Sequence, residues 1–398
     1  MHLYPIQNYI FWLLLIIVLC ARFSTYNYNS QIYFNGKNAS FRSYVLRHPY
    51  EEDGFQIIEA GKYKFKTDLK FKYCAGQYLN FNFDKKYLEN KVIYSPNIEI
   101  SQSMTINAIC LFSSFRDYLI QRVLGGLKQP YAGLLLGILI GYRQSFPSNF
   151  ENAFKATGIV HIVVFSGANV SFITDLVLPL AKKFGSRLYF IFSSAIFIMI
   201  LLLVGFEVPV IRASIMGFIK NFALIVGVDP DPFILIFYSA FVMLFIHPPL
   251  IQSVSFYLSF GAVIAMVIAG DISSFVQGPF KDIVLSFLVS TLMFPLLGFY
   301  FGKVSLIGFF VNFLINFSIP FIMKFGFLYL IIPNLLLKMI VSIFLEYIFS
   351  VARLFSLFDF VDYSVNISGD LLIAFYLPVV AGYFFWKVFF AGAFIKYE

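Results

Sequence analysis

Charged residues are scarce in this chain: Asp, Glu, Lys and Arg make up only 13% of its 398 residues, roughly half the share found in soluble proteins. Apolar and aromatic residues make up 60%, and a water-soluble fold of this length could not bury them all. A bilayer removes that requirement, because lipid is itself an apolar phase. The composition therefore predicts an integral membrane protein that crosses the bilayer many times.

Residues typical of metal and redox sites are also few. The three cysteines, Cys20, Cys74 and Cys110, form no Cys-x-x-Cys pair, and the four histidines are scattered. This spacing does not fit a zinc site, and we expect neither a metal nor another cofactor. Cys20 lies in an apolar segment. Cys74 and Cys110 lie in the one polar region and could form a disulfide if that region is outside the cytoplasm.

Long runs of Lys or Arg are missing, although the net charge is +8. The scattered positive charge fits the excess of Lys and Arg in cytoplasmic loops of membrane proteins. It also fits a polyanionic partner, either lipid headgroups or nucleic acid. A phosphate-binding loop of the form Gly-x-x-x-x-Gly-Lys-Ser/Thr is missing as well, so energy for any transport would have to come from a partner.

The first 107 residues predict a membrane anchor followed by a small β domain. The apolar run from Ile10 to Ala21 has no preceding Lys or Arg, which favours a retained anchor within residues 1–26 over a signal peptide. Within residues 27–107 the apolar period becomes two. Aromatic residues alternate with lysines over 62–73, predicting a hairpin that turns near Thr67-Asp68, and residues 79–84 predict a further strand. We expect a β-barrel or sandwich.

The lysines on one face of this predicted hairpin have two interpretations. They form either a solvated strand face or an electrostatic track for a phosphate backbone. The residues are Lys62, Lys64, Lys66, Lys70 and Lys72.

Residues 108–157 predict interfacial segments. An amphipathic helix over 108–128 has Leu111, Phe115, Tyr118, Leu119 and Val123 on its apolar face and Arg116, Asp117, Gln121 and Arg122 on its polar face, so we expect it to lie along the membrane surface. Residues 132–141 are apolar but too short to span, which favours a re-entrant segment. Residues 144–157 predict a polar amphipathic helix.

Residues 158–398 are almost wholly apolar and predict a polytopic helical domain. With the anchor, we expect about ten spans and one re-entrant segment. Pro320 and Lys324 predict that the longest apolar segment is kinked or broken. The predicted spans are 159–180, 188–205, 209–227, 232–247, 253–270, 281–301, 304–332, 336–357 and 371–392.

The basic residues between spans predict the orientation. Lys182, Lys183 and Arg187 cluster between two spans, which places that loop in the cytoplasm. Counting spans from there places both termini in the cytoplasm and the β domain outside. Lys303 falls outside and argues against this arrangement.

Polar residues inside the apolar segments are the candidate functional residues, because charge in a bilayer is costly. They group around His161, Ser166, Gly167, Asn169 and Asp175, around Glu207, Arg212 and Lys220, and around Ser255 and Ser259. Each can form a hydrogen bond between packed helices. The two cations of the second group can instead line a route for something negative. A catalytic Ser166–His161 pair is disfavoured by its spacing of five residues on one helix, and we expect no enzyme.

The order of these motifs resembles the ComEC-type competence proteins, the inner-membrane channels for DNA uptake in natural transformation. The matching segments are the glycine-rich residues 133–141, Ala156-Thr157-Gly158, His161, Ser166-Gly167-Ala168-Asn169-Val170, Ile211-Arg212-Ala213-Ser214-Ile215-Met216, Asp229-Pro230 through His247-Pro248, and Tyr257-Leu258-Ser259-Phe260. Tyr257 stands where the family has Gln, and Asn169 where it more often has His. Residues 81–100 are similar to the closing segment of the family's OB-type domain.

The resemblance implies a channel that passes single-stranded DNA inward through residues 158–398. His161, Ser166, Gly167, Asn169, Asp175, Arg212, Lys220 and Ser259 would line it, and the OB-like domain of residues 27–107 would receive DNA on its lysines. The chain ends at Glu398 without the His-x-His-x-Asp-His cluster of the lactamase-like domain of long members. We therefore expect a separate nuclease, besides a DNA receptor and a cytoplasmic ATPase or helicase. The alternative is a membrane transporter or a lipid- or anion-handling protein of the same fold without a DNA role.

Overall fold

The structure is a computed structural model that describes most of the chain. The described residues are 15–23, 33–35, 38–45, 48–52, 55–60, 63–68, 73, 78–84, 88–89, 92–94, 96–100, 106–142, 146–162, 165–182, 185–278, 280–305, 307–358, 363–365 and 367–387. The chain divides into two compact units. The first comprises Met1–Phe146, Ile162–Phe256 and Ile322–Ser342, and the second comprises Pro147–His161, Tyr257–Phe321 and Ile343–Glu398.

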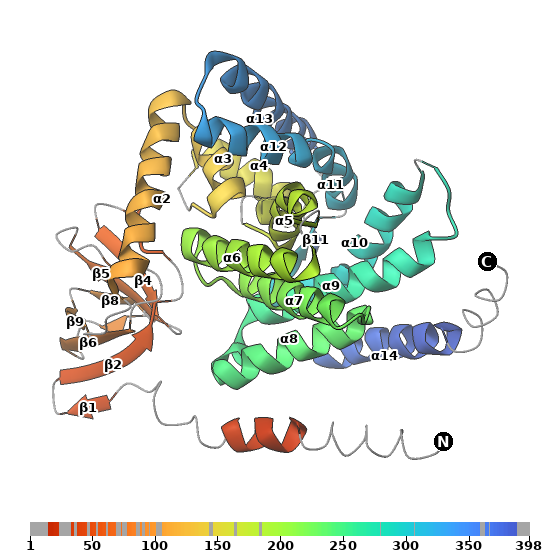
Figure 1. The fold of residues 1–398 in the computed structure, drawn as a ribbon, viewed down its shortest axis with the longest axis horizontal. Coiled ribbons are helices and arrows are strands. Elements are labelled where there is room, and N and C mark those ends of the chain that lie inside the picture. Colours follow the sequence, from red (N-terminus) through yellow and green to blue (C-terminus); the bar gives the residue numbers. More distant parts are fainter. Residues whose placement is uncertain are drawn as a thin grey trace. The chain divides into compact units, whose positions relative to one another are not determined.

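The N-terminal part of the first unit is a β region of two sheets (Figure 1). The four-stranded sheet is antiparallel, and the five-stranded sheet is mixed because β5 runs parallel to β8. One sheet has the order β1-β2-β6-β9, and the other has the order β3-β4-β5-β8-β7. An isolated antiparallel bridge pairs Val45, which follows β2 of the first sheet, with Ala60 on β4 of the second. The strands are β1 (Tyr33–Asn35), β2 (Asn38–Tyr44), β3 (Tyr50–Glu52), β4 (Phe55–Ala60), β5 (Tyr63–Thr67), β6 (Tyr78–Asp84), β7 (Leu88–Glu89), β8 (Val92–Tyr94) and β9 (Asn97–Ile100).

Alternation of apolar and polar residues places one face of each sheet in a shared core. Phe65 on β5 and Phe81 on β6 are fully buried, and their rings stack with centroids 3.7 Å apart. Phe41 lies opposite Phe81 in the ladder and packs on the same cluster. The period of two along β5 and β6 is therefore confirmed, because every second side chain points to the same face.

Two details of the predicted β domain differ from the structure. The hairpin predicted at Thr67-Asp68 is wrong: β5 pairs with the preceding strand β4 on one side and runs parallel to β8 on the other. Alternation alone cannot choose a strand's partners, since they are set by the whole sheet. A closed OB-like barrel is not confirmed, because the described strands form two sheets.

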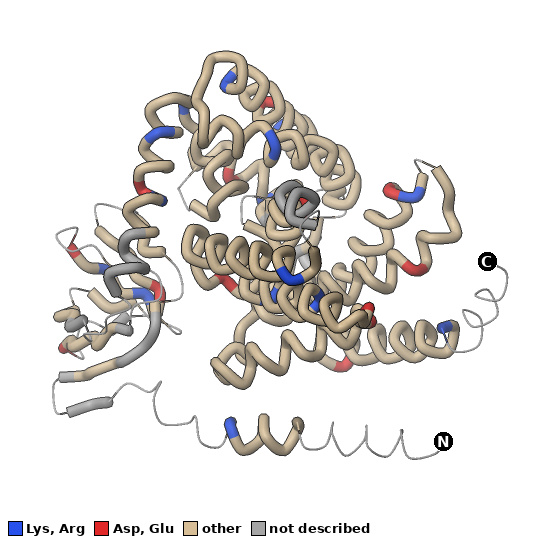
Figure 2. Tube along the Cα trace, in the orientation of Figure 1, with Lys and Arg blue, Asp and Glu red and all other residues tan. Residues whose placement is uncertain are grey.

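The described residues from 106 to 387 are mainly helical. The helices are α2 (Ile106–Gly126), α3 (Tyr131–Ile140), α4 (Ser148–Ala156), α5 (Gly167–Lys182), α6 (Ser186–Val204), α7 (Val208–Ile225), α8 (Pro232–Ile246), α9 (Val254–Ser273), α10 (Phe280–Phe301), α11 (Gly308–Asn316), α12 (Ile319–Ile331), α13 (Leu335–Phe355) and α14 (Gly369–Trp386). Short elements are the 3-10 helices η2 (Val160–Ile162) and η3 (Pro248–Gln252) and the strands β10 (Lys303–Val304) and β11 (Tyr363–Ser364). Charged residues are thinly spread over these helices (Figure 2).

Membrane-spanning character is confirmed, but the count of ten spans is not. Among the described residues, six helices are long and apolar enough to cross a bilayer: α6, α7, α9, α10, α13 and α14. The pair α11 and α12 would add a seventh, and it is bent by 46°. That bend confirms the broken segment predicted from Pro320 and Lys324. The chain is therefore a multi-pass membrane protein.

The predicted span 159–180 is interrupted in the structure. Residues 160–162 form η2, and α5 begins only at Gly167 and has 16 residues. The predicted span 232–247 matches α8, which has 15 residues. Asp231 caps α8 by accepting a hydrogen bond from the Phe233 N–H at 2.8 Å, and Pro232 fits its first position. Neither α5 nor α8 has the length of the six spanning helices.

The predicted apolar face of α2 is only partly right. Leu119 and Val123 of that face are buried, whereas Phe115 and Tyr118 are exposed, and Arg116, which was placed on the polar face, is buried. The buried stripe consists of Arg116, Leu119, Ile120, Val123 and Leu127, whose spacing of three and four residues is that of one helix face. Arg116 thus extends an apolar stripe by one turn toward the β region.

Candidate functional site

The candidate site lies where the C-terminal end of the short helix α3 meets the start of α5. The residues of α3 from Ala132 to Ile140 are all buried, which is consistent with a segment that does not span. The last carbonyl groups of a helix lack partners within the helix. Asn169 on α5 supplies one: its side-chain N–H group donates to the Ile138 carbonyl oxygen at 2.9 Å. Ser166 in turn donates to the Asn169 Oδ1 atom at 3.2 Å.

Arg212 on α7 lies directly against the start of α5. Its side chain is only 6% exposed. A methyl group added at Gly167 would lie 2.6 Å from the Arg212 Nη2 atom and 3.4 Å from the Ala213 Cβ atom. Glycine at this position therefore lets the guanidinium group approach the backbone. The structure brings Arg212 of one sequence motif against Ser166, Gly167 and Asn169 of another.

Other predicted site residues lie away from this cluster. Lys220 on α7 and Asp175 near the middle of α5 are both exposed. Ser259 is buried on α9, in the second unit. The side chains of His161 and Cys110, and residues Lys62, Lys70, Lys72 and Cys74, lie outside the described residues. Their predicted roles, the disulfide included, stay predictions.

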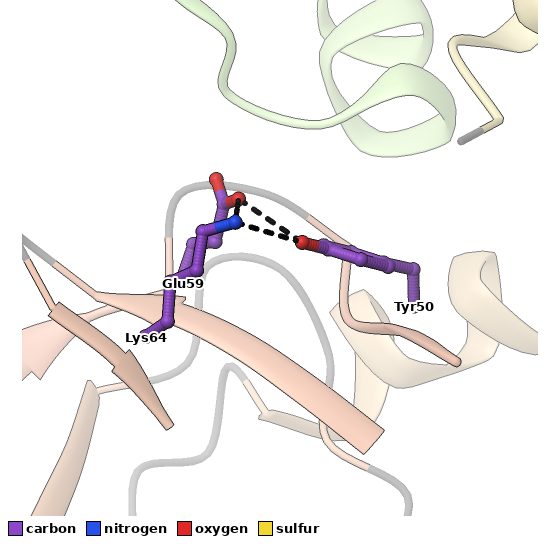
Figure 3. A network of polar contacts seen from close by, with 3 residues as sticks. All are labelled: Tyr50, Glu59 and Lys64. Carbon is purple, nitrogen blue, oxygen red and sulfur yellow. Dashed lines mark hydrogen bonds and ion pairs between the residues drawn. The ribbon is translucent and has the colours of Figure 1, made fainter. Parts of the chain in front are cut away.

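The two described lysines of the predicted DNA track both contact neighbours within the β region. Lys64 Nζ lies 3.8 Å from the Glu59 Oε1 atom and donates to the Tyr50 Oη atom at 3.5 Å. Tyr50 also donates to Glu59 at 3.4 Å, so the three side chains form a small network (Figure 3). Lys66 Nζ lies 5.8 Å from the centre of the Tyr94 ring. Any phosphate bound here would compete with these contacts.

A second polar site was missed by the sequence analysis. A pocket with about 280 Å³ of empty space, its open mouth included, is lined by His48, Pro49, Tyr50, Arg116, Gly141, Tyr142, Val204 and Glu207. His48, Arg116 and Glu207 are all buried. The sequence did contain one signal for this pocket: Arg116 lies three residues before Leu119 and seven before Val123, and so shares a helix face with these apolar residues. Nothing in the sequence placed His48 beside α2, because that contact depends on how the β region docks.

Burial decides the protonation of this second site. Burial and, to a smaller extent, the Arg116 charge together lower the pKa of His48 from 6.5 to about 3, against the opposing hydrogen bond to the Leu202 carbonyl group. His48 is therefore neutral at physiological pH. Burial also lowers the pKa of Arg116 to about 10, against the opposing effects of Asp117, Tyr142 and Glu207. Arg116 therefore stays charged at neutral pH.

Comparisons with known proteins identify the family. An uncharacterized protein from Aquifex aeolicus (strain VF5) is 27% identical to this chain over 161 residues, which are 39% of this chain. The match spans 38% of that relative's length. No solved structure matches the chain. The profile of the competence protein family matches residues 138–390, well over half of the chain and all of α5 and α7, so this protein belongs to the competence protein family.

Proposed function

We propose that this protein is a channel that passes single-stranded DNA into the cytoplasm during natural transformation. It would lie in the bacterial inner membrane with both termini in the cytoplasm and the β region outside, and it would transport DNA without a catalytic step. Membership of the competence family and the apolar helices support a membrane role in DNA uptake.

The observation that carries the proposal is Arg212, a buried cation on an apolar membrane helix. A charge within a membrane segment is expensive and usually marks an ion or substrate path. The polar groups of Ser166 and Asn169 lie on the neighbouring helix start, and Gly167 leaves room for the guanidinium group. Phosphates need compensating cations, which lipid does not offer. Arg212 would therefore meet the DNA backbone.

The test is transformation with linear DNA in strains that carry Arg212→Met. A charged hydrogen bond is worth roughly 1.5–3 kcal/mol, so transformation frequency should fall by about ten- to a hundredfold. Arg187→Met removes an exposed arginine at the start of α6 and is the matched control. A clean deletion should abolish transformation, and an unchanged frequency in that strain would end the proposal.

The contacts of Lys64 and Lys66 support a second candidate function. Lysines already engaged by Glu59 and Tyr94 are less available to DNA, and the same fold could then handle a small anion or a lipid headgroup at Arg212. Binding of single-stranded DNA to the full-length protein in nanodiscs, with steep salt dependence, favours the DNA channel. Binding of inorganic phosphate with no binding of DNA favours the alternative.

A further inference from the structure

The second polar site holds two buried nitrogen atoms that make no hydrogen bond: His48 Nδ1 and Arg116 Nε. The side chains are 7% and 6% exposed, and both line the same pocket. A buried polar atom without a partner costs roughly 1–3 kcal/mol. Buried polar groups in folded proteins nearly always have a partner, either protein or ordered water.

The chemistry of the two nitrogens defines the missing partner. His48 Nε2 lies 3.2 Å from the Leu202 carbonyl oxygen, which can only accept, so Nε2 carries the proton and Nδ1 is an acceptor. Arg116 Nε–H is a donor. The missing group must therefore accept from Arg116 and donate to His48, as a hydroxyl group or a water does.

Charged ligands fit poorly in this pocket. An anion would face the Glu207 carboxylate and the His48 Nδ1 lone pair, and a metal cation would face the Arg116 guanidinium group. A water molecule is neutral and small, and a polar pocket with two to four partners is where ordered water is retained. Tyr50 and Tyr142 also line the pocket.

We propose that this pocket binds one ordered water molecule, which bridges His48 and Arg116 and fastens the β region to the corner between α6 and α7. His48 and Tyr50 come from the β region, Arg116 comes from α2, and Glu207 is the N-cap residue immediately before α7. The bridge is thus a joint between the β region and the helix that carries Arg212. The bound water is independent of the proposed function, whereas the positioning of α7 for transport rests on it.

A structure of the full-length protein in nanodiscs, at a resolution that shows waters, tests the ligand. We expect an isolated density peak within hydrogen-bond distance of both His48 Nδ1 and Arg116 Nε. An elongated density would identify a lipid or sugar hydroxyl group as the bridge instead of water. A dry pocket, or direct contact between the two nitrogens, would overturn the proposal.

Hydrogen exchange of the full-length protein tests the joint without relying on transport. His48→Phe and Arg116→Met should each speed backbone exchange in residues 48–60 and 202–210 by about tenfold or more, because each leaves a buried polar partner behind. His48→Gln keeps a donor and an acceptor and should restore slow exchange. Arg122→Met removes an arginine from the same helix outside the pocket and is the control.

Two results would count against the joint. One is exchange in His48→Gln as fast as in His48→Phe, since that would show that side-chain shape and not hydrogen bonding matters. The other is equal exchange in Arg116→Met and Arg122→Met. If exchange responds as expected while transformation is unchanged, the joint stands and its positioning role for DNA transport fails.

Discussion

Gly167 is the residue that shows most directly how two sequence motifs combine. It begins α5, and its missing side chain leaves room for the guanidinium group of Arg212 on α7. Gly167→Ala should therefore push a buried arginine aside and lower the melting temperature of the purified protein, at a cost of about 1–3 kcal/mol for overpacking. Gly270→Ala on α9, where a methyl group meets nothing within 4 Å, should leave it unchanged. Equal melting temperatures would show that the two helices adjust freely.

His48 makes stability depend on pH in a defined window. Its pKa is about 3 in the folded protein against 6.5 when exposed, so the unfolded state binds more protons between these values. The stabilisation is complete above pH 6.5 and is lost as the pH falls toward 3, with a slope of up to about 1.4 kcal/mol per pH unit.

The measurement is denaturation of the full-length protein at pH 7.5, 6.0 and 4.5, compared with His48→Gln, which cannot titrate. The groups around the imidazole are Arg116, Glu207, Tyr142 and Tyr50, and the variant keeps all of them. The free energy of unfolding of the unsubstituted protein should fall relative to that of His48→Gln as the pH falls, because only His48 takes up a proton on unfolding. A constant difference would show that His48 is not buried in its neutral form.

At the scale of elements, the β region is held by stacked aromatic rings between its sheets. Phe65 is fully buried against Phe81, so Phe65→Ala should destabilise the region by about 3–5 kcal/mol and speed tryptic cleavage within residues 33–100. Phe55 on the adjacent strand β4 is 39% exposed, and Phe55→Ala is the control. Similar cleavage rates in the two variants would contradict the observed packing.

Four of the predicted spans agree closely with the helices of the structure. Predicted spans 188–205, 209–227, 281–301 and 336–357 match α6, α7, α10 and α13 to within two residues at each end, because an apolar run bounded by glycine, proline or charge leaves one helical assignment. Helix α5 was predicted less well. Near its start, Asn169 bonds the Ile138 carbonyl group, which lies 31 residues earlier in the chain, and Ser166 donates to Asn169.

At the scale of the whole molecule, the basic residues between the spans predict how the chain is oriented in the membrane. The basic loop around Arg187 should face the cytoplasm and the β region should face outside. Lys64→Cys and Arg187→Cys, each in a chain whose three cysteines are changed to serine, can be labelled with an impermeant maleimide. We expect Lys64→Cys to react in intact spheroplasts and Arg187→Cys only after lysis. The reverse result would invert the topology.

The sequence by itself determined that this is a multi-pass membrane protein, and where most of its helices and the alternating strands lie. Those features depend on local hydrophobicity and period, which are properties of neighbouring residues. Only the tertiary structure decided that Arg116 is buried, that β5 runs parallel to β8, and that Asn169 caps α3. Each of these depends on a partner far away in the sequence, and neither composition nor spacing specifies which distant surface a polar side chain will meet.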